Sequence, residues 1–374
     1  MADGSVTVRT ALVAASLSVN LACVAVLGVR VGGDTPRYVE GAANLGHRPL
    51  EGMQRLFPGY IALLAASTAA GFGAGGVVAL QIVMAAVATV LLYELGRRVA
   101  YPSVGIIAAG LFVLNVDIAR WHAYILTDSL YISLVVVAAY AIHIASERGG
   151  WRYAAAAAAL VAAALVRPHG RLLAIAAAVY WVARRPSHAS RAVAVAAAVA
   201  LIGAAAITAR GALRAEAESP GRWLGEGVVI WADPDSRLPM PGETGALTAA
   251  GATSAAPLAY AVRHPLATSR LAASRIGLEL LHARRFYSTA HNAAVVVTLG
   301  PTYVLAVLGF LRLRDRPLAW LLAGIAGLHF LMVAATFADW DGRFLLHVLP
   351  LLDLFAAAGL LVVTNRAWNG PLHP

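Results

Sequence analysis

The chain has 374 residues, of which 60% are hydrophobic and only 13% are charged. Soluble domains carry roughly 25% charged residues, so this composition excludes an ordinary soluble protein and indicates that lipid is the main solvent. The formal net charge of +10 comes from arginine alone, because the sequence contains no lysine. These arginines are scattered among apolar segments, which argues against nucleic acid as a partner and favours anionic lipid headgroups or other phosphates.

Ten apolar segments are long enough, or nearly long enough, to cross a bilayer. They lie near residues 10–31, 74–95, 102–120, 129–146, 151–166, 171–183, 191–209, 292–312, 318–337 and 344–363. The fold class we expect is therefore all-α, a polytopic membrane protein with about ten transmembrane helices and interfacial helices on the outer face. The segments 151–166 and 171–183 fall short of the roughly 20 residues of a usual span, so we read them as two short helices that meet in a polar turn.

The arginines between the segments predict the orientation. If the ten segments alternate, the arginine clusters in the short loops all fall on one side, which the positive-inside rule makes cytoplasmic. Both termini are then cytoplasmic. An arginine-only, alanine-rich composition is typical of a bacterial genome, so we expect the bacterial inner membrane. The chain reads as one domain, 1–374, with two long extracytoplasmic loops at 32–73 and 210–291.

Each long loop contains a helical stretch of ambiguous placement. Residues 57–71 are apolar, but a full crossing would move every later arginine cluster to the outside, so we expect a re-entrant or interfacial element on the outer face. After Pro265 the pattern becomes helical, with apolar positions and a complement of arginines. It fits a basic amphipathic helix at the membrane surface or, equally, a helix packed across the bundle with snorkelling arginines. Gly324 and Gly327 are expected to permit close helix packing.

The first extracytoplasmic loop opens with residues that could carry chemistry. Asp34 lies just past the first span, and it would be a helix N-cap if Thr35 or Pro36 begins a helix. Alternatively, Arg37 and Tyr38 fall one turn later on the same side, so a carboxylate, a guanidinium and a phenol meet at a membrane–water boundary. Asp128 has the same two interpretations, as the N-cap of the span that starts near residue 129 or as part of a site.

Five short elements of the sequence resemble the glycosyltransferase-C superfamily, above all its aminoarabinose transferase and protein O-mannosyltransferase-like branch. In chain order they are Asp34-Thr35-Pro36-Arg37-Tyr38, Phe57-Pro58-Gly59-Tyr60, Leu126-Thr127-Asp128, Arg167-Pro168-His169-Gly170, and Asp341-Gly342-Arg343-Phe344 through Pro350. The elements are weak singly, but five in order, on the outer side of a consistent topology, form a specific pattern that covers most of the chain.

The resemblance implies a membrane glycosyltransferase that moves a sugar, with inversion, from a polyprenyl-phosphate donor to an acceptor hydroxyl of a glycan, glycolipid or protein. It implies that Asp34 is the general base, a role in which a positioned carboxylate accelerates a reaction roughly 10²–10⁴-fold. Arginine holds phosphate oxygens with two parallel hydrogen bonds and stays charged. The donor-phosphate candidates are Arg37, Arg55 and Arg343, and the other substrate-binding candidates are Tyr38, Tyr60, Asp128, Arg167 and His169.

The sequence also departs from that superfamily. Many members carry a second acid directly after the first, and here that position is Thr35, which weakens the case for a catalytic metal. No histidine or acidic cluster has the sequence spacing of a metal site, so we expect no metal and no cofactor besides the lipid-linked sugar. The alternative function is a lipid or small-molecule transporter or flippase. Transporters, however, usually place charged groups near the bilayer midplane or at repeats, and neither is evident here.

Overall fold

The computed structural model describes residues 2–184, 220–242, 244–248 and 255–364. Within these ranges the chain consists of helices joined by turns, and the extended segments form only isolated β-bridges. The expected all-α fold is therefore confirmed. The segment 191–209, expected to be a span, lies outside the described residues.

Five of the described helices are long and apolar enough to cross a membrane. They are α1 (Ala2–Leu27), α4 (Gly73–Val99), α7 (Thr127–Arg148), α15 (Thr289–Leu313) and α16 (Pro317–Ala335). Five further apolar helices are shorter, namely α3 (Pro58–Ala69), α5 (Pro102–Leu114), α8 (Arg152–Val166), α9 (Gly170–Ala183) and α18 (Leu349–Thr364). A multi-pass membrane protein is thus confirmed, whereas the count of ten spans is not.

Two of the expected spans are interrupted at polar residues. The segment 102–120 ends as a helix at Leu114, because Asn115 adopts an extended conformation and its side chain accepts a hydrogen bond from the Ile118 N–H. This cap starts the separate short helix α6 (Val116–Trp121). The last span is also divided, into α17 (Arg343–Leu346) and α18, with His347 between them.

The centre of the bundle is α7, whose span is largely buried against α4, α8 and α9. On the opposite side α15 packs tightly along α18. A Cβ atom at Gly309 would meet the backbone of Phe355, and one at Gly359 would meet the backbone of Leu305. Close packing therefore uses Gly309 and Gly359, whereas none of the described residues has an atom within 4 Å of a Cβ at Gly324 or Gly327, so close packing at these two glycines stays a prediction.

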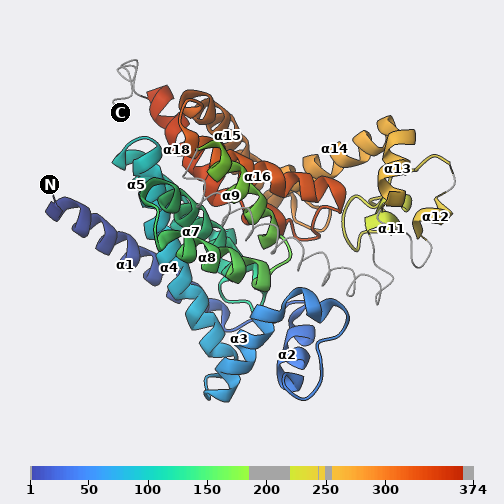
Figure 1. The fold of residues 1–374 in the computed structure, drawn as a ribbon, viewed down its shortest axis with the longest axis horizontal. Helices are drawn as coiled ribbons and strands as arrows, with labels where there is room; N and C mark the ends of the chain where they lie inside the picture. The colour runs from blue at the N-terminus through green and yellow to red at the C-terminus, as the bar shows by residue number, and fades with distance from the viewer. Residues whose placement is uncertain (1, 185–219, 243, 249–254, 365–374) are drawn as a thin grey trace.

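The two long loops form short helices outside the bundle. The first contains α2 (Thr35–Asn44), the 3-10 helix η1 (Gly52–Leu56) and α3, and the second contains α11 (Pro220–Gly225), α12 (Gly245–Thr248), α13 (Ala255–Arg263) and α14 (Pro265–Leu281). In Figure 1, α2 and α3 lie at the bottom and α11–α13 at the right, while α1 begins and α18 ends toward the left of the view.

The helix α14 begins at Pro265 as expected, but it is not a simple surface helix. It packs on α16, and Leu271 and Arg275 are fully buried. The Arg275 guanidinium donates to the backbone carbonyls of Val228, Ala334 and Trp223. Two of the arginines of the expected basic face, Arg275 and Arg284, are thus buried structural donors, which favours the packed interpretation over the surface one.

Candidate active site

The start of α2 is tied to the loop before α7. Arg30 forms a parallel bridge with Tyr124, and the hydroxyl of Thr35 donates to the Ile125 carbonyl at 2.9 Å. The same hydroxyl accepts the Gly32 N–H at 2.8 Å. Thr35 is buried, so the residue that stands where a second acid is common has a structural role here. This tie brings the first loop next to the first turn of α7.

Asp34 is at the N-cap position of α2, yet its side chain makes no capping hydrogen bond. Its carboxylate instead lies 3.5 Å from the Arg37 guanidinium and 3.9 Å from that of Arg343. The side chain is 39% exposed. The interpretation of Asp34 as only a cap is therefore wrong, and its partly exposed carboxylate faces two guanidinium groups instead.

Asp128 is the buried counterpart of Asp34. The N-cap of α7 is Leu126, so Asp128 lies inside the first turn, and its interpretation as the N-cap is wrong. One carboxylate oxygen lies 2.8 Å from Arg167 and 3.0 Å from His347, and the other lies 3.5 Å from Arg343. With three cationic or donor partners and 2% exposure, Asp128 organises the surrounding side chains.

Arg343 joins the two acids although more than 200 residues separate it from Asp128. The Nε and Nη2 atoms of Arg343 donate to the Asp339 carboxylate at 3.2 and 3.1 Å. The remaining nitrogen, Nη1, is directed at Asp34 and Asp128. Burial opposes the charge, but Asp128 and Asp339 outweigh burial and raise the pKa of Arg343. The guanidinium, stacked over the Trp121 ring, is thus permanently charged at the centre of the cluster.

The aromatic residues of the first loop form the wall behind Asp34. Tyr38 is buried and packs edge-to-face against Phe57 and Tyr60, each with ring centroids 5.2 Å apart. Burial, with the nearby Asp34 carboxylate, raises the pKa of the Tyr38 phenol, so it remains a neutral hydroxyl. The Tyr60 hydroxyl donates to Gln81 at 3.2 Å, which directs it away from the acids and into the bundle.

Arg55 is the one predicted phosphate ligand that the structure does not bring to this cluster. It lies exposed on η1, and its Nε donates to the Leu50 carbonyl at 2.8 Å. The described residues include no ion pair between Arg55 and an acid of the cluster. To bind the phosphate of the sugar donor, Arg55 would have to reach it from outside this cluster.

The turn of residues 167–170 contains two of the predicted residues, Arg167 and His169. Arg167 donates to the Thr127 hydroxyl at 2.7 Å and pairs with Asp128, so it fastens the end of α8 to the start of α7. His169 lies on the far side of His347, with ring centroids 5.9 Å apart. The predicted residues Asp34, Arg37, Tyr38, Asp128, Arg167 and Arg343 thus form one cluster, which we call the acidic–arginine centre.

The sequence interpretation missed His329, Asp339 and His347. His347 comes four residues after Arg343, within the same closing element, and this helical spacing was an available signal. His329 is an ionisable residue in an expected span, which is by itself an indication of function. Asp339 precedes Arg343 by four residues, and this spacing was the available local signal.

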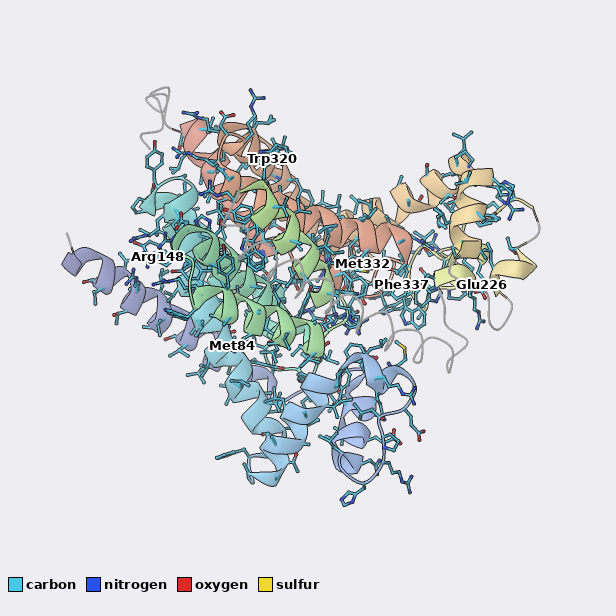
Figure 2. All side chains as sticks on the ribbon, viewed as in Figure 1. Met84, Arg148, Glu226, Trp320, Met332 and Phe337 are labelled. Carbon is cyan, nitrogen blue, oxygen red and sulfur yellow. The ribbon has the colours of Figure 1, made fainter. Side chains whose placement is uncertain are left out.

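A cavity of about 250 Å³ lies within the second long loop. Trp223, Trp231 and the charged Glu226 are among its lining residues. Trp231 pairs through its backbone with Ala338, next to Asp339. Phe337, labelled in Figure 2 with Glu226, packs against both tryptophans, with ring centroids 4.8 Å from Trp223 and 5.0 Å from Trp231. The cavity wall thus combines aromatic faces with charged side chains.

Residues 56–208 match the model of the dolichyl-phosphate-mannose-protein mannosyltransferase family. The matched stretch contains three of the five elements, those at residues 57–60, 126–128 and 167–170, and it excludes Asp34 and Arg343. Curated proteins give no match. The resemblance is confirmed over this stretch, which is less than half of the chain, and with the apolar helices it indicates a membrane glycosyltransferase similar to the glycosyltransferase-C type.

Proposed function

We propose that this membrane glycosyltransferase transfers a sugar, with inversion, from a polyprenyl-phosphate donor to an acceptor hydroxyl on the extracytoplasmic face, with Asp34 as general base. The observation that carries the proposal is the contrast between two carboxylates of one cluster. Asp34 is 39% exposed and has only the longer contacts with Arg37 and Arg343, whereas Asp128 is buried and fully engaged. Of the two, Asp34 is the one that can reach an acceptor.

The transfer requires charge compensation on the departing phosphate. The acceptor oxygen attacks the anomeric carbon, its proton passes to the Asp34 carboxylate, and the carbon–oxygen bond to the phosphate breaks with the electron pair on the leaving polyprenyl phosphate. Arg37 and the outward nitrogen of Arg343 lie on either side of Asp34, so both can neutralise that phosphate. In this scheme the arginines supply all the positive charge that the step requires.

The other residues would position these groups. Arg167 and His347 hold Asp128, Asp128 and Asp339 hold Arg343, and Tyr38 forms the wall beside Asp34. The cavity lined by Trp223 and Trp231 would receive the acceptor, because aromatic faces and charged edges suit a polar, partly apolar molecule such as a glycan.

The decisive test replaces Asp34 with Asn in protein reconstituted into liposomes, with transfer measured from a labelled polyprenyl-phosphate sugar. We expect turnover to fall by roughly 10²–10⁴-fold, because the amide cannot accept the proton. The matched control is Glu40→Gln, which removes an exposed carboxylate from the same helix and should leave turnover unchanged. Wild-type turnover in the Asp34→Asn protein would refute the assignment.

The donor class is tested independently by mass spectrometry of lipid that copurifies with the protein. A polyprenyl phosphate or its sugar conjugate is expected. Substrate uptake into vesicles without chemical change, in place of transfer, would support a transporter instead.

A further inference from the structure

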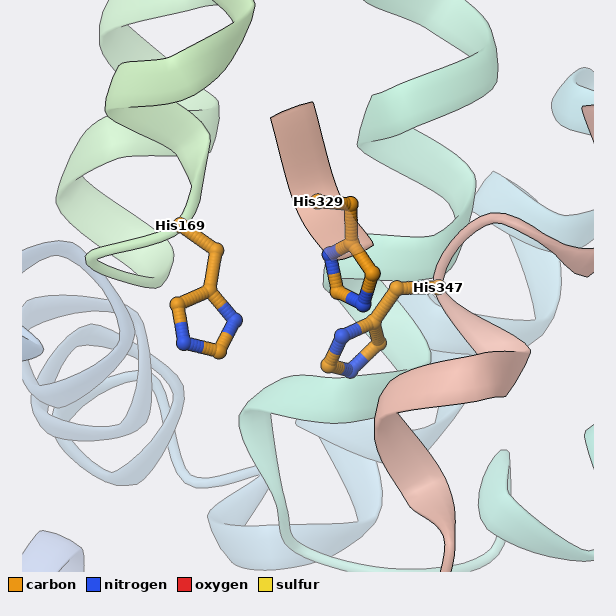
Figure 3. Close-up of side chains that lie close together, drawn as sticks. All are labelled: His169, His329 and His347. Atoms are coloured by element: carbon orange, nitrogen blue, oxygen red, sulfur yellow. The ribbon is translucent and has the colours of Figure 1, made fainter. Parts of the chain in front are cut away.

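Three histidines from separate segments converge beside the acidic–arginine centre. His169 precedes α9, His329 lies in α16, and His347 lies between α17 and α18. One ring nitrogen of each can be chosen so that all three lie within 4.8 Å of one another. Figure 3 shows the three imidazoles lying close together, and their ring centroids are 5.4–5.9 Å apart.

Each histidine has a buried ring nitrogen without a hydrogen-bond partner among the described residues. These atoms are Nδ1 of His169, Nε2 of His329 and Nδ1 of His347. His329 is 3% exposed and His347 is fully buried. An unsatisfied buried polar group is costly, so three such nitrogens in one cluster point to a ligand that all of them share.

His347 is already oriented as a metal ligand. Its Nε2 lies 3.0 Å from the Asp128 carboxylate, which leaves Nδ1 for the cluster. A carboxylate behind a histidine fixes the ring and raises its basicity toward a metal.

We propose that His169, His329 and His347 together bind one divalent transition-metal ion, with Zn²⁺ the ion that this ligand set suits best. Three neutral imidazoles with a fourth open position are a familiar zinc ligand set, and imidazole also suits copper and nickel. Zinc–nitrogen bonds of about 2.0–2.1 Å place tetrahedral ligand nitrogens roughly 3.3 Å apart. The imidazoles would close on the ion by up to about 1.5 Å, within reach of side-chain rotation.

The surroundings tolerate the added charge. The positive side chains Arg167 and Arg343 are each paired with a carboxylate, Asp128 or Asp339, so the neighbourhood carries no uncompensated positive charge from them. The ion would link the α8–α9 turn, α16 and the α17–α18 junction. Through His347 it would also fix the position of Asp128, which makes it a positioning element beside the proposed chemistry rather than part of it.

The competing explanation is that the three rings are only packed aromatic surfaces. Phe344 lies edge-to-face against His169 at 5.0 Å, and Tyr131 lies against His347 at 4.9 Å. Such packing accounts for the proximity of the rings but leaves the three nitrogens unpaired. Metal binding distinguishes the two explanations directly.

The test uses the full chain purified in detergent, stripped with a chelator and titrated with Zn²⁺ against a chromophoric competitor. We expect about one ion per chain. His329→Ala should lose this binding, whereas the control His143→Ala should retain it, because His143 is a buried histidine that pairs with Tyr180 outside the cluster. Asp128→Asn should weaken binding on the order of 10–100-fold, as loss of a supporting carboxylate does.

Co²⁺ in place of Zn²⁺ supplies a measurement that does not depend on the folding of any variant. The wild-type protein should show the visible absorption of Co²⁺ bound to a few imidazoles in a low-coordinate site. Absence of that spectrum, or equal Zn²⁺ binding by wild type and the triple alanine variant, would overturn the proposal. Since binding is read without any sugar transfer, this outcome is separate from the fate of the proposed activity.

Discussion

At the scale of single residues, the geometry of arginine decides how the acidic–arginine centre is held. One terminal nitrogen of Arg167 donates to both the Thr127 hydroxyl and the Asp128 carboxylate, at 2.7 and 2.8 Å. The guanidinium also stacks over the Phe344 ring at 5.3 Å. A planar guanidinium donates through its edge while its face stacks on the ring, whereas a compact ammonium has no planar face to stack. Charge alone is therefore insufficient at position 167.

We expect Arg167→Lys to destabilise the protein by about 1.5–3 kcal/mol, the range for hydrogen bonds to charged groups, because the lysine cannot keep both contacts and the stacking. Thermal unfolding in detergent measures the change. The control is Arg148→Lys, an exposed arginine at the other end of α7 that is labelled in Figure 2, and it should be neutral. Equal shifts in the two variants would show that Arg167 has no special structural role.

At the scale of elements, close backbone contacts set where the helices of the site meet. A Cβ atom at Gly59 would meet the backbone of Leu165, and one at Gly170 would meet the backbone of Ala163. Both contacts involve α8, the helix that ends at Val166, directly before Arg167. Glycine is therefore required in the elements at 57–60 and 167–170 for a steric reason, independent of any contact with substrate.

The variant Gly170→Ala should destabilise the protein by roughly 1–3 kcal/mol, because the methyl group would overlap a backbone that cannot move aside. The matched control is Gly110→Ala in α5, where a Cβ meets nothing within 4 Å. That variant should be neutral or slightly stabilising, as alanine favours a helix by roughly 0.5–1 kcal/mol over glycine. Denaturation midpoints of the two proteins provide the comparison, and a neutral Gly170→Ala would contradict the close contact.

At the scale of the whole molecule, a buried carboxylate ties the second long loop to the bundle. Glu279 of α14 accepts the backbone N–H groups of Asp339 and Leu345, each at 2.8 Å. Arg284 lies 3.8 Å away and is itself bonded to the Asp339 and Trp340 carbonyls. The segment that presents Arg343 to the site is thus held from the side opposite the acids.

The burial of the Glu279 carboxyl group predicts that the stability of the protein depends on pH. Burial, with the Asp339 carboxylate, raises the pKa of Glu279 to about 7 from its ordinary 4.5, despite the opposing effect of Arg284. A raised carboxylate pKa means that the folded state holds the proton more tightly, so its contribution is present below pH 4.5 and is lost as the pH rises toward 7. Glu279→Gln should flatten this loss between pH 5 and 7 in thermal unfolding experiments. An unchanged slope would assign the dependence to other groups.

Much of the candidate site was predictable from local patterns. Asp34, Arg37 and Tyr38 are one helical turn apart, and Asp128 and Arg167 lie at the boundaries of apolar segments, where ionisable groups meet water. Arg55 lies outside the cluster, because position along the chain does not reveal that its Nε is directed to Leu50, and its role as a phosphate ligand stays a prediction. His329 and His347 were missed because the metal-ligand spacings that sequence reading recognises are local.

The amino-acid sequence by itself determined the all-α membrane architecture, since hydropathy acts on each segment separately and the cost of exposing backbone to lipid forces each segment into a helix. It also determined the family resemblance and the residue types of the centre. Only the tertiary structure decided which carboxylate is exposed, which is buried, and that three distant histidines share one centre. Burial and pairing between residues far apart in the chain follow from packing, which no local pattern encodes.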